Sequence, residues 1–186
     1  MQERRLTLPF DEETARSLRV GQPALLTGII YTARDAAHKR LIELVDAGEP
    51  LPVDLRNQTL YYVGPAPASP GHAVGSAGPT TSYRMDPYTP KLLALGLRGM
   101  IGKGLRSQPV IDAMKQYGAV YFGAVGGAAA LIARSIESSR VIAYPDLGAE
   151  AIHEFVVRDF PVTVIIDTLG QNLYELGPKT YKRERT

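Results

Sequence analysis

The stretch that decides the fold lies near the middle of the chain and reads RGMIGKGLRSQPVIDAMKQYGAVYFGAVGG, residues 98–127. It predicts a short strand at 98–101, a turn at 102–104, a helix at about 107–117 and a second strand at 119–122. A further helix at 128–136 and a strand at 141–144 follow. Strands that alternate with helices favour right-handed βαβ crossovers and parallel pairing. The sequence therefore predicts an α/β fold.

Two more strands are expected on the N-terminal side of this block. Residues 5–8 have the pattern of a short strand, and a short helix follows at 11–18. The apolar run at 23–33 is typical of a strand that is covered on both faces. A helix then begins after Thr32, which can cap it with Asp35 at the third helical position.

The C-terminal part adds a second group of strands. Residues 155–167 predict two strand-like runs broken at Pro161, which implies a second sheet or an edge. A layered α/β domain with a mixed sheet fits this order better than a uniform doubly wound sheet. The length of 186 residues favours one domain, 1–186.

Charge and composition exclude several classes of function. The 21 basic residues nearly balance the 19 acidic ones, so the net charge of +2 does not indicate a nucleic-acid partner. The basic run at 179–186 is more typical of a solvated tail than of a binding element. The absence of cysteine excludes disulfides, thiolate nucleophiles and thiolate-held metals within this chain. No apolar segment approaches the roughly 20 residues of a membrane span, and none resembles a signal peptide, so a cytoplasmic protein without a membrane partner is expected.

A pattern suited to anion binding stands at 78–86, GPTTSYRMD. Backbone N–H groups of the Gly-Pro turn, the hydroxyls of Thr80 and Thr81 and the guanidinium of Arg84 can converge on a carboxylate or phosphate. An ordinary N-capped turn explains the same residues about as well on the local pattern alone.

Lys103 can supply a second cation to this site. Ligands of parallel sheets collect where strands end and helices begin, so the turns after Ile101 and Phe122 should open onto one edge. Lys103 lies in the first of these turns, between glycines that let a ligand approach the backbone. The alternative is that Lys103 is only the polar tip of a tight turn.

Arg34 and His38 lie one turn apart on the helix that follows Thr32, and they extend its apolar stripe toward the N-terminus. Burial of such groups is costly unless an anion or a cleft meets them. The alternatives are that both reach solvent at the helix end, or that Arg34 pairs with Asp35 or Glu43.

Nucleotide and metal motifs do not match. The P-loop pattern fails because Leu97 stands at the position of its first glycine and Gly104 follows the lysine. The glycines at 123–127 lack the spacing of the dinucleotide fingerprint. The three histidines show no metal-ligand spacing.

Four motifs in order carry a resemblance to a known family: ARDAAH at 33–38, GPTTSYRMD at 78–86, MIGKG at 100–104 and FGAVGGAA at 122–129. Together they resemble the beta subunit of class I fumarases and L-tartrate dehydratases, over nearly the whole chain. They equally resemble the C-terminal domain of single-chain class I fumarases. The resemblance implies a three-layer β/β/α swivelling domain with a parallel or mixed sheet.

For function, the resemblance implies a hydro-lyase that adds water reversibly across the double bond of a small dicarboxylate. In this family an oxygen-sensitive four-iron four-sulfur (4Fe-4S) cluster is held by cysteines of an alpha subunit, and its open iron acts as a Lewis acid. This chain would then bind no cofactor and no metal itself. It would supply the opposite wall of the site and be active only with the alpha subunit, in at least a heterodimer.

Carried over position by position, Arg34, Arg84 and Lys103 match the family's ligands of the substrate carboxylates, and Thr80 and Thr81 match its threonine pair. Thr80 is the candidate base for the carbon-bound proton. An unperturbed hydroxyl is a very poor base, so it needs nearby cations or a proton acceptor. Arg84 and Lys103 would provide that help, and they would also stabilise the charge that builds on the substrate as the proton leaves.

The choice of function stays between three classes. The carboxylate ligands serve fumarate and L(+)-tartrate alike, and fumarate hydratase is favoured only because it is the more widespread assignment for such chains. The family resemblance leads us to expect a small residue, often Gly, at the position of Tyr83, so the shape of the pocket and the substrate can differ here. A non-catalytic dicarboxylate-binding or assembly module would bind its ligand without an iron-sulfur partner, and a nucleotide-binding domain would show nucleotide affinity.

Overall fold

The computed structural model of the protein describes residues 1–124 and 129–177. Within these residues the strands are β1 (Arg4–Thr7), β2 (Pro23–Thr32), β3 (Thr59–Tyr61), β4 (Gly99–Gly102), β5 (Val120–Ala124), β6 (Ile136–Ala143) and β7 (Ile152–Ile166). The helices are α1 (Glu12–Ser17), α2 (Asp35–Asp46), α3 (Thr89–Ala94), α4 (Gln108–Tyr117) and α5 (Ala129–Ser135), with the 3-10 turns η1 (Ser82–Met85) and η2 (Pro145–Glu150).

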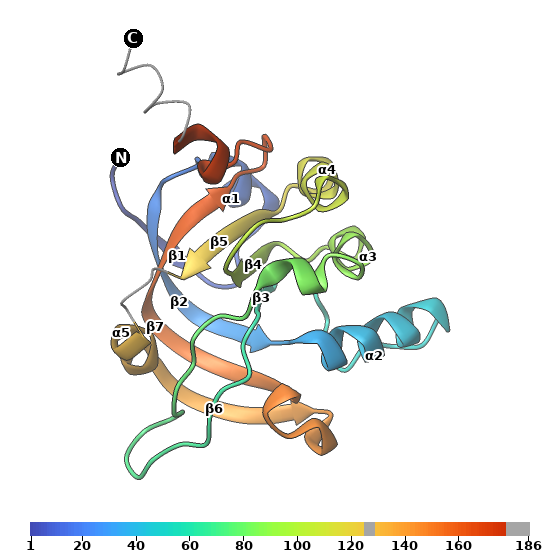
Figure 1. Cartoon of the computed structure of the whole chain (residues 1–186), viewed down its shortest axis with the longest axis vertical. Coiled ribbons are helices and arrows are strands. Elements are labelled where there is room, and N and C mark those ends of the chain that lie inside the picture. The colour runs from blue at the N-terminus through green and yellow to red at the C-terminus, as the bar shows by residue number, and fades with distance from the viewer. Residues whose placement is uncertain (125–128, 178–186) are drawn as a thin grey trace.

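In this part of the chain the seven strands form one mixed sheet in the order β1-β2-β3-β4-β5-β7-β6. The neighbours from β1 to β5 are parallel, which confirms the βαβ prediction for β4 and β5. The third strand of that prediction, expected at 141–144, belongs to β6, which begins at Ile136 and pairs with β7 in the antiparallel direction, so this part of the prediction is wrong. The long strand β7 runs antiparallel to β5 and β6 and also pairs with β2, so the sheet is partly closed (Figure 1). The predicted α/β fold with a mixed sheet is confirmed.

Two hydrophobic cores lie on opposite faces of the sheet. Because side chains alternate along a strand, Tyr61 and Phe122 point into one core, which lies inside the partly closed sheet, while Leu60 and Tyr121 point into the other. The second core lies under α2, α3 and α4. The layers expected from the family resemblance, strands on strands with helices outside, are therefore present.

The burial of β2 differs from the prediction of cover on both faces. Ala24, Leu26 and Ile30 are buried, whereas Leu25 and Ile29 are partly exposed. The helices of the second core pack over β3, β4 and β5, and only the end of β2 reaches that core, at Tyr31. The outward face of β2 is therefore only partly covered.

The predicted cap of α2 is wrong. Thr32 is the last residue of β2, and its hydroxyl accepts a hydrogen bond from the backbone N–H of His153 at 2.9 Å. The helix begins at Asp35, with Arg34 at the N-cap position and no side chain capping it. The threonine hydroxyl is used between strands, so it does not cap the helix.

The predicted break at Pro161 is also wrong, because β7 continues through it. Pro161 pairs with Leu25 of β2. On its other side, the pairing with β6 ends at Val157 and the pairing with β5 begins at Val162. Among the described residues, β2 is the one strand that pairs at the proline, and a proline is tolerated where a strand has a neighbour on one side only.

Two sequence predictions fall outside the described residues: the basic run at 179–186 and most of the glycine turn at 123–127. The assignment of 1–186 to one domain stays a prediction. No helix in the described ranges is long and apolar enough to cross a membrane.

Candidate active site

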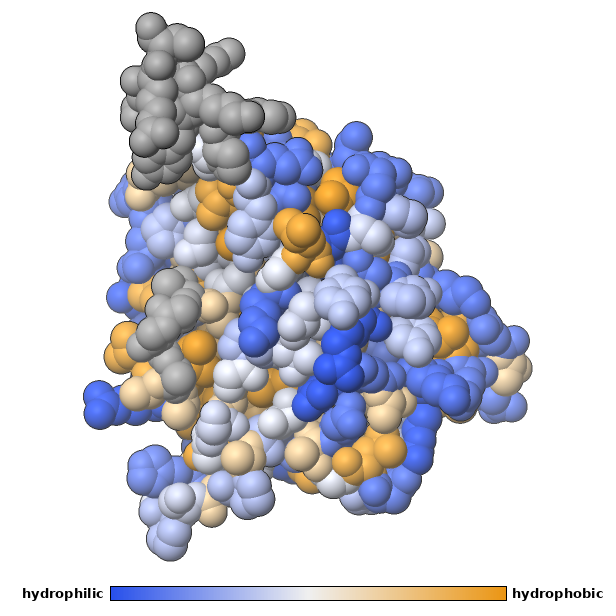
Figure 2. Space-filling view, viewed as in Figure 1, coloured by the Kyte–Doolittle hydropathy of each residue, from blue (hydrophilic) through white to orange (hydrophobic). Residues whose placement is uncertain are grey.

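The segments that carry the predicted site residues meet at one edge of the parallel strands. Arg34 follows β2, and Lys103 follows β4. The segment at 80–84 crosses the same edge, where η1 lies beside the start of α2 (Figure 1). The carboxyl ends of parallel strands are the usual place for ligands in such sheets. The face of the molecule seen in Figure 1 carries strongly hydrophilic residues next to hydrophobic ones (Figure 2).

Backbone pairing brings the threonine pair and the lysine together. Thr81 and Lys103 form an isolated parallel bridge, and the N–H of Ser82 donates to the carbonyl of Lys103 at 2.8 Å. The N–H of Thr80 donates to the carbonyl of Tyr62 at 2.6 Å. The short segment thus lies in register beside the end of β4, and the position of its threonines relative to Lys103 is set by main-chain hydrogen bonds.

The side chains of this pair of segments are available to a ligand. Both threonines are half-buried and Lys103 is exposed. Within the described ranges, neither threonine hydroxyl has a protein hydrogen-bond partner and the Lys103 ammonium has no ion pair. Hydroxyl and ammonium donors that lack protein partners suit an anionic ligand.

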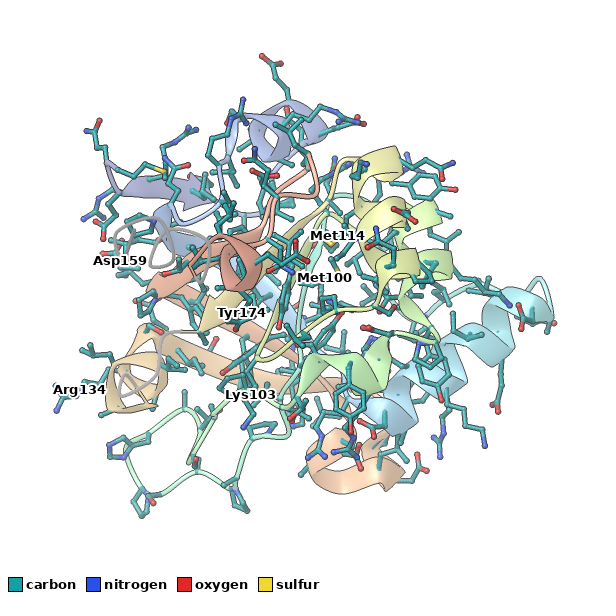
Figure 3. All side chains as sticks on the ribbon, turned by 45° about the horizontal axis from the view of Figure 1, so that its top comes forward. Met100, Lys103, Met114, Arg134, Asp159 and Tyr174 are labelled. Atoms are coloured by element: carbon teal, nitrogen blue, oxygen red, sulfur yellow. The ribbon has the colours of Figure 1, made fainter. Side chains whose placement is uncertain are left out.

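A hollow of about 240 Å³ opens beside Lys103. Its wall includes Gly123 and Ala124 at the end of β5. The turn predicted after Phe122 lies mostly outside the described residues, so its opening onto the same edge stays a prediction. Lys103 and Tyr174 lie near each other at the centre of the molecule in Figure 3, and both line this hollow.

Arg84 is held by the first residue of α2. Its Nη2 lies 2.5 Å from Oδ2 of Asp35, and the Arg84 side chain is 44% exposed. An ion pair at this distance favours one orientation of the guanidinium, and among the described residues Asp35 is its one ion-pair partner, so its other N–H groups can meet a ligand. The ion pair also joins η1 to the beginning of α2.

Arg34 does not pair with Asp35 or Glu43. Its Nε lies 3.8 Å from Oε1 of Glu150 in η2, which is an ion-pair distance and too long for a hydrogen bond. Both atoms are buried and have no hydrogen-bond partner in the part of the chain that the structure describes. A Cβ on Gly64 would lie 3.2 Å from the Arg34 side chain, so this glycine lets the loop pack against the guanidinium.

His38 is buried, so the expectation that it reaches solvent is wrong. Its Nδ1 lies 2.8 Å from the carbonyl oxygen of Arg34, and a carbonyl only accepts, so Nδ1 carries the proton. Burial lowers the pKa of His38 to about 4, which leaves the ring neutral at pH 7. The ring packs edge-on against Tyr62, with centroids 5.4 Å apart.

A buried polar cluster beside these segments was missed by sequence reasoning; its members are Tyr62, Asp86, Arg106 and Tyr121. The Arg106 side chain is fully buried, and its Nε donates to Oδ1 of Asp86 at 2.7 Å. Its guanidinium lies between the two tyrosine rings, 5.3 and 5.0 Å from their centroids. Asp86 ends the motif at 78–86, but nothing in the sequence pairs it with an arginine 20 residues away.

The arrangement combines three cations with two hydroxyls at one edge of the sheet. Backbone pairing unites Thr80, Thr81 and Lys103, and an ion pair fixes Arg84 at the start of α2. Arg34 follows the neighbouring strand and packs against η2. The described residues contain no group of three or more side chains that could hold a metal ion. Such a surface suits a small molecule with two negative charges.

Comparison with known proteins identifies the family. The family model described as the fumarase C-terminus matches residues 2–177. The chain is 45% identical over 152 residues to the aerobic class I fumarate hydratase of Escherichia coli (strain K12), covering 81% of this chain and 28% of that protein. It is 41% identical over 157 residues to fumarate hydratase 2 of Leishmania major, covering 83% of this chain and again 28% of the relative.

A shorter relative matches along nearly its whole length. This is the putative L(+)-tartrate dehydratase subunit beta of Methanocaldococcus jannaschii, 35% identical over 179 residues, with 92% of each chain covered. The chain thus spans a little over a quarter of the length of the two fumarate hydratases and nearly all of a protein named as one subunit.

Proposed function

We propose, because the chain belongs to the fumarase C-terminus family, that it serves as the beta subunit of a class I fumarate hydratase, which interconverts fumarate and L-malate. The observation that carries the proposal is the backbone pairing of Thr81 with Lys103, which puts the threonine pair beside a cation that forms no ion pair with the described residues. A reaction on a dicarboxylate needs such a cation, because proton removal next to a carboxylate builds negative charge on its oxygens.

The role of a subunit is supported by a relative that is itself named as one. The relative from M. jannaschii is named subunit beta and is covered over 92% of its length. The two fumarate hydratases contain this region as 28% of a longer polypeptide. We propose that the remaining part of the enzyme is an alpha subunit.

The iron-sulfur cluster implied by the family resemblance does not fit this chain. The sequence has no cysteine, and the described residues contain no cluster of metal-ligating side chains. We therefore place the cluster in the alpha subunit, where it would act as a Lewis acid on the substrate. This chain's own contribution is carboxylate binding and proton transfer.

In the proposed mechanism, Arg34, Arg84 and Lys103 bind the two carboxylates and Thr81 donates a hydrogen bond to the substrate. Thr80 Oγ1 accepts the proton from the carbon that becomes part of the double bond. The electron pair of that C–H bond moves onto the adjacent carboxylate and then forms the double bond as the neighbouring carbon releases its hydroxyl as hydroxide. The hydroxide and the proton released from Thr80 together account for the water that is formed. Cations stabilise the charge that develops, and they also stabilise an ionised hydroxyl on Thr80.

Substrate choice is the second part of the proposal. Dehydration of L(+)-tartrate is the alternative, and it is favoured by the relative named tartrate dehydratase subunit beta, which this chain covers almost completely. We favour fumarate, because the relatives of highest identity cited above are fumarate hydratases. Tyr83 is 62% exposed next to Arg84 and could contact the additional hydroxyl of a tartrate.

The test is anaerobic co-purification of this chain with the alpha subunit, followed by assay with fumarate, L-malate and L(+)-tartrate. Interconversion of fumarate and L-malate would support the proposal, whereas dehydration of tartrate alone would transfer it to the alternative substrate. Dicarboxylate binding by the chain alone, with no cysteine-rich partner and no turnover in the pair, would instead favour a non-catalytic binding module.

A further inference from the structure

We infer that the buried polar cluster, Tyr62, Asp86, Arg106 and Tyr121, is a set of positioning residues that fixes the threonine segment against the lysine segment. The inference rests on the proposed function, because it concerns the spacing of residues proposed to bind one substrate. In this proposal none of the four side chains contacts the substrate.

The ion pair in the cluster connects the two segments directly. Asp86 directly follows η1, which carries Arg84, and Arg106 lies three residues beyond Lys103. One oxygen of Asp86 accepts from Arg106 Nε at 2.7 Å, and the other accepts from the backbone N–H of Ser107 at 2.5 Å. A single carboxylate thus holds both the side chain and the main chain of the segment that carries the lysine.

Tyr121 makes a second connection through its hydroxyl. The hydroxyl donates to the carbonyl of Gly104 at 2.9 Å and lies 2.8 Å from Oγ of Ser82. Since the tyrosine proton is used on the carbonyl, Ser82 is the donor in the second bond. One buried hydroxyl therefore bridges the residue after Lys103 and the residue after Thr81.

The segments are in close contact at Gly102. A Cβ on Gly102 would overlap Oγ of Ser82 and come within 2.9 Å of the Tyr62 ring. Tyr62 also accepts the N–H of Thr80 at its carbonyl and packs its ring against His38, whose Nδ1 donates to the carbonyl of Arg34. The contacts of the cluster thus reach all three segments of the site.

Stabilising the fold does not explain the cluster, because apolar side chains at the same positions could stabilise it as well. A buried ion pair often gives no more stability than well-packed apolar residues of the same volume, because both charges lose their hydration. Here the Arg106 side chain is 0% exposed and that of Asp86 is 8% exposed. What the pair adds over apolar packing is directional bonding, and directional bonds fix the relative position of the two segments.

The test compares three substitutions in the assembled enzyme, each of which removes one side-chain hydroxyl. Tyr121→Phe removes the bridging hydroxyl, and Ser82→Ala removes its partner on the threonine segment. Ser135→Ala is the matched control, because it also deletes a buried serine hydroxyl with one hydrogen bond, to the carbonyl of Ile132 in α5. Each variant is assayed by steady-state kinetics and by amide hydrogen exchange of the Ser82 N–H, which donates to Lys103.

We expect Tyr121→Phe and Ser82→Ala to raise the exchange rate of the Ser82 amide and to lower kcat by about tenfold or more, with a smaller change in KM, since misplacement by a fraction of an ångström is costly to turnover. Ser135→Ala should change neither. Unchanged exchange and unchanged kcat in both variants would overturn the inference. A wild-type enzyme that turns over no dicarboxylate would sink the proposed function instead, and the exchange rates would still decide whether the cluster holds the segments together.

Discussion

The protonation state of His38 is set by the buried surroundings of its ring. The ring is buried between aromatic side chains and donates to the carbonyl of Arg34, so charging it would place a cation where water cannot reach. Burial lowers the pKa from the usual 6.5 to about 4. A neutral ring can hold the helix start at Arg34 without adding a positive charge beside the cations of the site.

Acid is therefore expected to destabilise the protein through His38. The folded pKa lies below the unfolded one, so the unfolded chain binds the extra proton between these values and stability falls as pH drops from about 6.5 toward 4. The full effect is about 3 kcal/mol. Chemical denaturation at about pH 7 and pH 4.5 should show this loss in the wild type and a clearly smaller loss in His38→Phe. Equal losses in both proteins would show that His38 does not carry the effect.

Arg84 is the residue whose removal should be most informative for binding. If Arg84 binds a substrate carboxylate as proposed, Arg84→Ala deletes a charge-assisted contact, so kcat/KM in the assembled enzyme should fall about 10²-fold or more while unfolding is little changed. Arg140→Ala is the matched control, because Arg140 also forms an exposed ion pair, with Glu154, but lies on β6. Similar kinetics for the two variants would remove Arg84 from the site.

At the scale of elements, Gly102 sets the distance between β4 and the threonine segment. Gly102→Ala introduces a Cβ that overlaps Ser82 and crowds the ring of Tyr62, both of which are buried. We expect a loss of about 1–3 kcal/mol in the free energy of unfolding, as for overpacking in a core. Gly177→Ala, where a Cβ meets nothing within 4 Å, should change the denaturation midpoint very little. A tolerated Gly102→Ala would mean that the segments can separate easily.

Removing one partner of the Asp86–Arg106 ion pair should cost more stability than replacing both. Asp86→Leu alone leaves a buried, unpaired guanidinium and should cost about 3–5 kcal/mol, whereas adding Arg106→Met should recover much of that stability. The double variant should nevertheless remain slow, because apolar side chains do not restore the directional bonds. Denaturation together with kcat would test this, and a double variant with full activity would show that packing alone positions the segments.

Elements with local signals were predictable from the sequence, and those set by distant partners were not. The strand at 98–101, its turn and the helix after it follow from apolar periodicity and glycine punctuation. Thr32 was predicted to cap a helix, yet its hydroxyl bonds to a residue on β7 that is 121 positions away. Pro161 breaks a strand by local rules, but in the described part of the chain it lies where β7 pairs with β2 alone, and this depends on the order of the strands.

In the candidate site, too, some features were predictable from local sequence patterns and others depended on distant partners. The threonines, Arg84 and Lys103 belong to compact motifs, and the topology of parallel strands explains why their segments meet at one edge. The pairing of Asp86 with Arg106 could not be predicted, because it depends on the packing of η1 against the segment before α4. The carboxylate that orients Arg84 belongs to Asp35, which was expected at the third helical position of a capping box with Thr32, so its pairing with Arg84 was also missed.

At the scale of the whole molecule, the partly closed sheet gathers three segments at the ends of β2, β3 and β4, while their hydrophobic residues fill cores on both faces. The cations therefore lie at the ends of strands whose side chains are packed on both faces. In the proposed enzyme the alpha subunit covers this side and excludes water, which strengthens the contacts to the carboxylates.

The proposed base can be examined in the complete enzyme. Thr80→Ala should abolish most turnover, because no hydroxyl remains to accept the carbon-bound proton, while Thr80→Ser should retain measurable activity. Exchange of the malate carbon-bound proton with deuterated water, followed by NMR, would report this step directly. Equal proton exchange in the wild type and Thr80→Ala would assign the proton to another group.

The most direct test of the central claim is the rate of fumarate hydration by the assembled enzyme, wild type against Lys103→Ala, with equal amounts of alpha subunit bound. Lys103 is exposed, so its removal should leave the fold and the assembly intact. We predict turnover of fumarate by the wild type and a fall of about 10²-fold or more in kcat/KM for the variant. Equal rates in the two enzymes would contradict the claim that this edge of the sheet binds the substrate.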